Sequence, residues 1–180
     1  MKAIKLFAAI LLALALMCSA ALAELELDLG STEFLGQPLE DFIVDTIDGK
    51  GFTLSETLKD HDMVYIVLWA TWCENCDESF AQLQQAWEKY GDRVAVLALS
   101  VEEEDTDEAL KSYAEARGLT FAIGRDTAGL AEAFGLYSVP YIAVVDRFGC
   151  VAYAEIGGPG DQDALERLFG VFLEDRKSVV

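Results

Sequence analysis

A continuous apolar run at residues 63–70 leads almost directly into a pair of cysteines, and a helical pattern follows the pair. The run is rich in β-branched and aromatic side chains and has the length of a strand, so it predicts a strand buried on both faces. Over residues 74–90, apolar side chains recur at helical spacing until Gly91, which predicts an amphipathic helix ending there. The cysteines, Cys73 and Cys76, therefore lie where a buried strand passes into a helix.

The alternation of strands and helices continues along the chain. Shorter apolar runs predict further strands, and segments with helical spacing predict helices between them. The expected strands are residues 42–47, 52–54, 93–101, 120–123, 139–146 and 150–156, and the expected helices are residues 55–59, 107–117, 127–134 and 161–174. The first two strands form a hairpin, Ser55 caps the first helix, and Asp105 or Thr106 caps the helix after the acidic residues 102–108. This order predicts one α/β domain with helices on both faces of its sheet.

The amino terminus has the order of an export signal. Lys2 and Lys5 precede an unbroken apolar stretch at residues 6–17, and a small-x-small cleavage site follows at Ala21 and Ala23. This order is typical of a secretory signal peptide. The predicted organisation is a signal peptide at residues 1–23, a polar lead at residues 24–34 and a folded domain at residues 35–176. We therefore expect a protein of the periplasm, the cell envelope or the extracellular space.

Two alternatives to cleavage stay open. Residues 6–23 just reach the length of a membrane span, so the segment could remain as an uncleaved anchor. Lipidation at Cys18 is the other alternative, but Met17 stands where a lipoprotein signal normally has a small residue. Export is common to all three interpretations.

Composition excludes several classes of function. The 180 residues include 32 acidic and 13 basic side chains, which give a formal net charge of −19. Nucleic acid and anionic membrane surfaces require clustered Lys and Arg, so neither is expected as a partner. The single histidine, His61, leaves little for a His-built catalytic site or metal cage, and we expect no metal. No apolar run after residue 23 is long enough to span a bilayer.

The cysteine pair has a chemical logic of its own. At a helix amino terminus, the sulfur of Cys73 lies over unpaired backbone N–H groups and the positive end of the helix dipole, which favour its thiolate. Cys76 lies one turn further on, within bonding distance of Cys73, and can close a disulfide. Such a pair can exchange disulfides through a mixed-disulfide intermediate. A C-x-x-C pair alone is a weak signal, but the preceding strand, the following helix and Trp72 beside it make it a strong one.

The chain resembles the thioredoxin-like superfamily, in particular the exported TlpA/ResA-like thiol-disulfide oxidoreductases of the redoxin family. The residues that carry the likeness are Leu68-Trp69-Ala70-Thr71-Trp72-Cys73-Glu74-Asn75-Cys76, the early hairpin, and the turn from Asp146 to Gly149 after Ser138-Val139-Pro140. The resemblance implies a three-layer α/β/α sandwich with a central mixed β-sheet and an N-terminal β-hairpin. It also implies that Cys73 is the nucleophile and Cys76 the resolving thiol.

The same resemblance implies the surroundings of the pair. Pro140 matches the family's cis-proline, and with Trp72 and Val139 it would shape the substrate groove. The redox-active disulfide would be the only redox group, with no further cofactor. The implied partners are protein thiols or disulfides and a membrane electron donor.

The chain departs from its relatives at three positions. Asn75 stands where many of them have Pro, Val67 where thioredoxins have a buried Asp, and Ser79 where some ResA-like members have Glu. The proton-relay acid of the family is therefore not identified. Glu78 is the nearest stand-in by position.

Charge near the pair suggests a direction of electron flow. Glu74, Asp77 and Glu78 crowd the cysteines, and no Lys, Arg or His lies between Met63 and Trp87. Negative charge disfavours the Cys73 thiolate and lowers the reduction potential, which predicts a reductant. The alternative is that these acids merely occupy an exposed first turn, where Asp and Glu are common.

Three other functions are alternatives to an oxidoreductase: a thiol peroxidase, a metal-binding module and a domain with a structural disulfide. A thiol peroxidase of the same superfamily would keep a single peroxidatic cysteine, which Trp-Cys-x-x-Cys does not match. A metal-binding module would need Cys73, Cys76, Cys150 and His61 to converge. Cys150 should instead lie about 20 Å from the pair, because about six residues of strand separate it from the active end. A non-catalytic domain with a structural disulfide is the third alternative.

Overall fold

The computed structural model describes residues 34–174. The predicted signal peptide, nearly all of the polar lead and the last two residues of the expected domain lie outside the described residues. A five-stranded sheet forms the centre of the fold, in the order β5 (Ala122–Arg125), β4 (Val94–Ser100), β3 (Met63–Trp69), β6 (Tyr141–Asp146) and β7 (Val151–Ile156). Strands β3, β4 and β5 are parallel, whereas β6 and β7 are antiparallel to their neighbours, so the sheet is mixed as expected.

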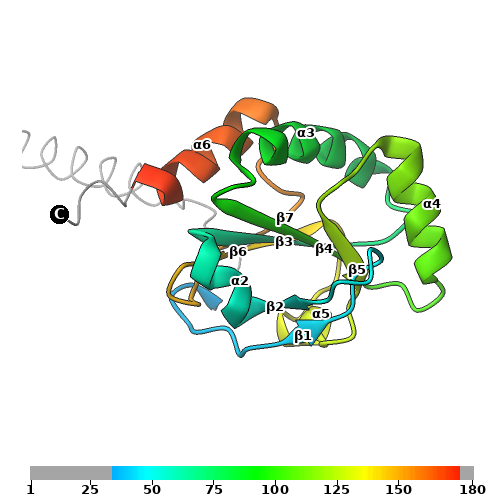
Figure 1. The fold of residues 1–180 in the computed structure, drawn as a ribbon, viewed down its shortest axis with the longest axis horizontal. Helices are drawn as coiled ribbons and strands as arrows, with labels where there is room; N and C mark the ends of the chain where they lie inside the picture. Colours follow the sequence, from blue (N-terminus) through cyan, green and yellow to red (C-terminus); the bar gives the residue numbers. More distant parts are fainter. Residues whose placement is uncertain (1–33, 175–180) are drawn as a thin grey trace, which may run out of the picture.

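Helices cover both faces of this sheet (Figure 1). One face carries α3 (Glu74–Tyr90), α4 (Asp107–Arg117) and α6 (Gln162–Glu174). The other carries α2 (Leu54–Asp60), α5 (Leu130–Ala133) and the hairpin of β1 (Ile43–Val44) and β2 (Phe52–Thr53). The predicted three-layer sandwich with an N-terminal hairpin is therefore confirmed.

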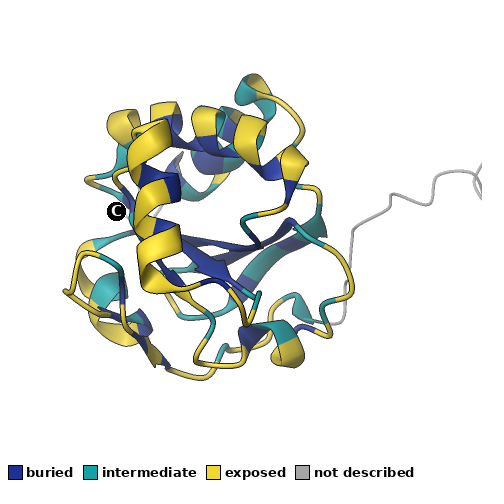
Figure 2. Cartoon of the chain, turned by 90° about the vertical axis from the view of Figure 1, so that its right-hand side faces the viewer, coloured by how far each residue is buried: buried dark blue, intermediate teal, exposed yellow. Residues whose placement is uncertain are grey.

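The central strand β3 is buried along its whole length, as its apolar run predicts. Because successive strand side chains point to opposite faces, Tyr65, Val67 and Trp69 pack beneath α3 and α4. Val64, Ile66 and Leu68 pack on the side of α2 and the hairpin. Figure 2 shows the result as a buried sheet between helices whose outer surfaces are exposed. Within residues 34–174, no helix combines the length and apolarity that crossing a membrane requires.

Helix starts show where local expectation was wrong. Ser55 does not cap α2, which begins one residue earlier at Leu54. Its backbone N–H and hydroxyl donate instead to the carboxylate of Asp41, at 2.8 and 2.7 Å. Thr106 does cap α4, because its hydroxyl oxygen accepts from the N–H of Ala109. The carboxylate that accepts a hydrogen bond from the start of α2 thus belongs to Asp41, 14 residues earlier in the chain, and not to Ser55 itself.

The helix expected over residues 127–134 is reduced to the single turn of α5. Gly129 adopts a left-handed conformation just before this helix, with φ of 74°. The carboxylate of Asp126 accepts the N–H groups of Leu130 and Ala131, at 2.9 and 2.7 Å. Residues 127–129 of the predicted helix therefore form a turn between Asp126, which caps α5, and the helix itself.

Candidate active site

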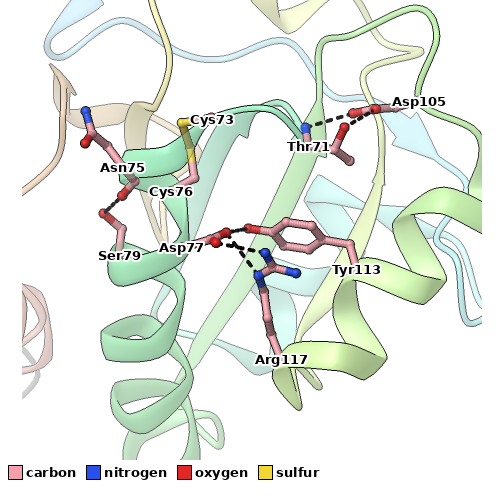
Figure 3. The surroundings of a disulfide bond; sticks show 9 residues. All are labelled: Thr71, Cys73, Asn75, Cys76, Asp77, Ser79, Asp105, Tyr113 and Arg117. Atoms are coloured by element: carbon pink, nitrogen blue, oxygen red, sulfur yellow. Dashed lines mark hydrogen bonds and ion pairs between the residues drawn. A yellow bond between two sulfur atoms is a disulfide. The ribbon is translucent and has the colours of Figure 1, made fainter.

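The cysteine pair lies where β3 ends and α3 begins (Figure 3). Cys73 is the N-cap residue of α3, and its N–H donates to the carbonyl of Ala70 at 3.0 Å to close a tight turn. Cys73 and Cys76 form a disulfide with their Cα atoms 5.4 Å apart. Cys76 is fully buried, whereas 6% of Cys73 is exposed. Of the two cysteines, only Cys73 has any exposed surface.

The start of α3 provides the chemistry expected of a nucleophilic thiol. The first N–H groups of a helix have no partners within it and carry the positive end of the dipole. A thiolate at the N-cap position of a helix is stabilised by both, so this helix start is compatible with the predicted role of Cys73 as the nucleophile. The buried Cys76 lacks contact with water and suits the second, resolving step.

The residues predicted to form the groove lie near the end of β3 that leads to the cysteines. Register pairs Leu68 of β3 with Tyr141 of β6, so Pro140 stands beside the end of β3 that leads to the cysteines. The Val139–Pro140 peptide bond is cis, as the family resemblance implies. Trp72 is 64% exposed, and its indole N–H donates to Glu102 at 2.8 Å. The arrangement is compatible with a groove, and the role of Trp72, Val139 and Pro140 in binding substrate stays a prediction.

The charge around the pair differs from the expectation. Arg117 of α4 reaches Asp77, with Nη2 2.8 Å from Oδ2 and Nε 3.0 Å from Oδ1. The hydroxyl of Tyr113 donates to the same carboxylate. The hydrogen bonds from Arg117 and then from Tyr113 hold the pKa of Asp77 below its usual range. A cation 40 residues away along the chain thus neutralises one of the acids.

The other two acids, Glu74 and Glu78, are exposed and have no ion-pair partner in the part of the chain that the structure describes. Glu78 follows Cys76 by two positions, which is about 200° around a helix. Its carboxylate therefore leaves α3 on the side opposite the buried Cys76, and this placement does not support a proton relay. Asn75 is also exposed, and its carbonyl accepts the hydroxyl of Ser79 at 3.0 Å.

A buried acid behind the turn was missed. Asp105 is only 5% exposed, and its carboxylate accepts hydrogen bonds from Thr71 and from Ser100. The sequence suggested Asp105 only as one of two possible helix caps. A usable signal was present, because Thr71 and Ser100 are polar residues at the ends of two adjacent buried strands. Polar groups at that depth need partners.

Cys150 and His61 lie away from the pair. Met63 pairs with Asp146, so the turn that carries Cys150 is at the opposite end of β3 from Cys73. Cys150 is a free, half-buried thiol. The ring of His61 contacts the carbonyl of Thr57, at 3.0 Å, where α2 ends. Among residues 34–174, no group of three or more His, Cys, Asp or Glu side chains is arranged to hold a metal ion.

Comparison with known proteins extends these observations. The model of the AhpC/TSA family matches residues 35–154. The thiol-disulfide oxidoreductase ResA of Bacillus thuringiensis subsp. konkukian is 28% identical over 134 residues, 73% of this chain and 75% of the relative. The thioredoxin-like protein YneN of Bacillus subtilis is 26% identical over 123 residues, 68% of this chain and 71% of the relative. The crystal structure of a thiol:disulfide interchange protein from Chlorobium tepidum has a TM-score of 0.66 at 24% identity, with coverage of 76% and 95%, and shares the fold.

Proposed function

The chain belongs to the AhpC/TSA family and is a thiol-disulfide oxidoreductase of the thioredoxin-like redoxins. We propose that it is exported and that it reduces protein disulfides. The observation that carries the proposal is the disulfide at the start of α3, with Cys76 fully buried and Cys73 beside the exposed Trp72. The signal-like residues 1–23 support export, and they lie outside the described residues.

The proposed reaction is two successive thiol-disulfide exchanges. The Cys73 thiolate attacks one sulfur of a substrate disulfide, forms a mixed disulfide and releases the other substrate sulfur as a thiolate, which takes up a proton. The Cys76 thiolate then attacks the sulfur of Cys73 and releases the second substrate sulfur. The substrate gains two electrons, and the protein is left with its Cys73–Cys76 disulfide. A dithiol of a membrane electron donor would reverse the process, with no cofactor beyond the disulfide itself.

Electrostatics supports the reductant direction. Arg117 compensates Asp77, but Glu74 and Glu102 remain near the exposed side of the pair, with Glu102 held by the indole of Trp72. Negative charge disfavours a thiolate, which lowers the stability of the reduced form and with it the reduction potential.

The equilibrium reduction potential of the Cys73/Cys76 couple tests this proposal, measured on residues 24–180 with Cys150→Ser to remove the third thiol. A reversible value below about −230 mV is expected of a reductant, and one above about −180 mV would indicate an oxidant that introduces disulfides. Absence of a reversible couple would contradict the oxidoreductase role and leave a structural disulfide. A Cys73→Ser variant that loses stability but no activity would point the same way.

A further inference from the structure

The carboxylate of Asp105 accepts three hydrogen bonds, and all of them come from residues outside its own loop. Its Oδ1 accepts the hydroxyl of Thr71 at 2.6 Å, and its Oδ2 accepts the N–H of Thr71 at 3.1 Å and the hydroxyl of Ser100 at 2.5 Å. The neighbouring Thr106, not Asp105, caps α4. The carboxylate is therefore free to hold residues of other elements, and two of its three hydrogen bonds go to one residue (Figure 3).

The residue held in this way belongs to the turn that presents the nucleophile. Thr71 lies between the end of β3 and Cys73, the N-cap of α3. Within this turn, the N–H of Cys73 donates to the carbonyl of Ala70. Ser100 ends the adjacent strand β4, whose register with β3 is fixed by seven residue pairs. The carboxylate thus ties the turn to the end of β4, the strand that pairs with β3.

A buried carboxylate is costly unless it is hydrogen-bonded, and hydrogen bonds to a charged group are stronger than those between neutral groups. Both oxygens of Asp105 are used, so Thr71 is held through its backbone and its side chain together. Cys73 is the N-cap residue of α3, so the backbone of this turn sets where its side chain lies relative to the first N–H groups of the helix. Small displacements in a reacting site reduce its efficiency.

We propose that Asp105 is a positioning residue of the redox site, which holds Thr71 and thereby keeps the Cys73 sulfur over the amino terminus of α3. This inference rests on the proposed function, in which Cys73 is the attacking thiol. Two effects of Asp105 must be separated. As a clamp it favours the Cys73 thiolate, whereas as a negative charge, together with Glu74 and Glu102, it disfavours it. Asp77 adds little to this charge because Arg117 pairs with it.

The separating experiment uses Thr71, because Thr71→Val keeps the shape of the side chain and the charge of Asp105 but removes the hydroxyl. The reduced full chain with Cys18→Ser and Cys150→Ser is alkylated over a range of pH, and the midpoint of the profile and the rate below the midpoint are measured for Cys73. With Thr71→Val we expect the midpoint to rise by about a half to one pH unit, so that the rate at a pH below both midpoints falls by about three- to tenfold. Thr71→Ser retains both hydrogen bonds and should restore the unsubstituted profile.

Thr106→Ala is the matched control, since it removes the cap of α4 one residue from Asp105 without touching Thr71. It should lower thermal stability and leave the profile unchanged. An unchanged profile in Thr71→Val, or an equal shift in Thr106→Ala, would overturn the proposal. A fall of the midpoint in Asp105→Asn, with no effect of Thr71→Val, would mean that Asp105 acts by charge alone and would also overturn it.

Failure of the proposed function has a different signature. In that case, the Cys73/Cys76 couple shows no reversible potential even with Thr71 and Asp105 intact, and the positioning role of Asp105 is then wrong as well. If that couple is reversible and only Thr71→Val has no effect, the positioning role alone is wrong. Should Asp105→Asn fail to fold, the two Thr71 variants still decide.

Discussion

Single residues at the redox site differ chiefly in their access to water. Cys73 is 6% exposed, and the neighbouring Trp72 is 64% exposed, whereas Cys76, on the buried face of α3, has no exposed surface. An incoming disulfide can therefore approach Cys73 and not Cys76. The proposed division of tasks, attack by Cys73 and resolution by Cys76, agrees with this difference in exposure.

This difference predicts a trapped intermediate. In Cys76→Ser, with Cys150→Ser as background, Cys73 can attack a substrate disulfide but nothing inside the protein can release it. We expect a stable mixed disulfide that non-reducing electrophoresis and intact-mass measurement detect. Cys73→Ser in the same background should form none. Equal trapping by both variants would contradict the assignment of roles.

The Asp77–Arg117 pair predicts a pH effect on stability. Because the pKa of Asp77 is lowered in the folded chain, its contribution is fully present above the unfolded value of about 3.9 and is lost as pH falls through the lower folded value. The Asp77 side chain is 48% exposed, so solvent screening limits the loss in Asp77→Asn at pH 7 to about 0.2–1 kcal/mol. Urea unfolding of a double-mutant cycle with Arg117→Gln, at neutral and acid pH, measures it. Zero coupling at pH 7 would contradict the pair's contribution.

At the scale of elements, helix starts in this fold depend on side chains from outside the helix. Asp41 satisfies the first turn of α2, and Asp126 satisfies that of α5. An isolated helix as short as α5 is unstable in water, because one turn forms too few hydrogen bonds to offset the conformational entropy lost in nucleation. Such a helix persists because it is capped and because Leu130 is buried in the core.

The cap of α5 can be tested directly. Asp126→Ala removes the acceptor for two N–H groups, and we expect a loss of about 1 kcal/mol in the free energy of unfolding. Asp126→Asn keeps one acceptor oxygen and should lose less. Urea denaturation with an unchanged slope measures both. An Asn variant no more stable than the Ala variant would argue against capping as the cause.

At the scale of the whole molecule, the hairpin is fastened to the edge of the sheet by a close backbone contact. Thr46 bridges to Gly124 of β5, and the N–H of Ile47 donates to the carbonyl of Ile123 at 2.8 Å. A Cβ atom at Gly124 would lie 2.4 Å from the carbonyl oxygen of Asp45. Only glycine lets the two backbones approach so closely.

Gly124→Ala should therefore separate the hairpin from β5 and cost about 1–3 kcal/mol. Gly170→Ala is the control, because a Cβ there meets nothing within 4 Å and alanine is the better helix former, by up to about 1 kcal/mol. Thermal and urea unfolding compare the two. A Gly124→Ala protein as stable as the unsubstituted chain would mean that the hairpin is not held by this contact.

Prediction from sequence succeeded where a signal was local. The bounds of α3 and α4 were predicted to the residue, because apolar spacing and a following glycine mark them, and Gly118 closes α4 with a left-handed φ of 64°. The strand β3 and the position of the cysteines between strand and helix followed from the same kind of pattern. The strand expected at residues 120–123 begins two residues later, as β5 (Ala122–Arg125), because its four residues take their place from pairing with β4.

By itself, the amino-acid sequence predicted the order of strands and helices and the two cysteines at the start of α3, because periodicity and turn residues act over a few positions. Only the tertiary structure decided which charges the pair experiences. Arg117 reaches Asp77 from 40 residues away, and Asp105 reaches Thr71 from 34 residues away. These contacts exist because parallel pairing brings the ends of β3 and β4 together and α4 packs beside α3. The sequence between two such residues does not indicate that they will be in contact, so only the packing of the elements brings them together.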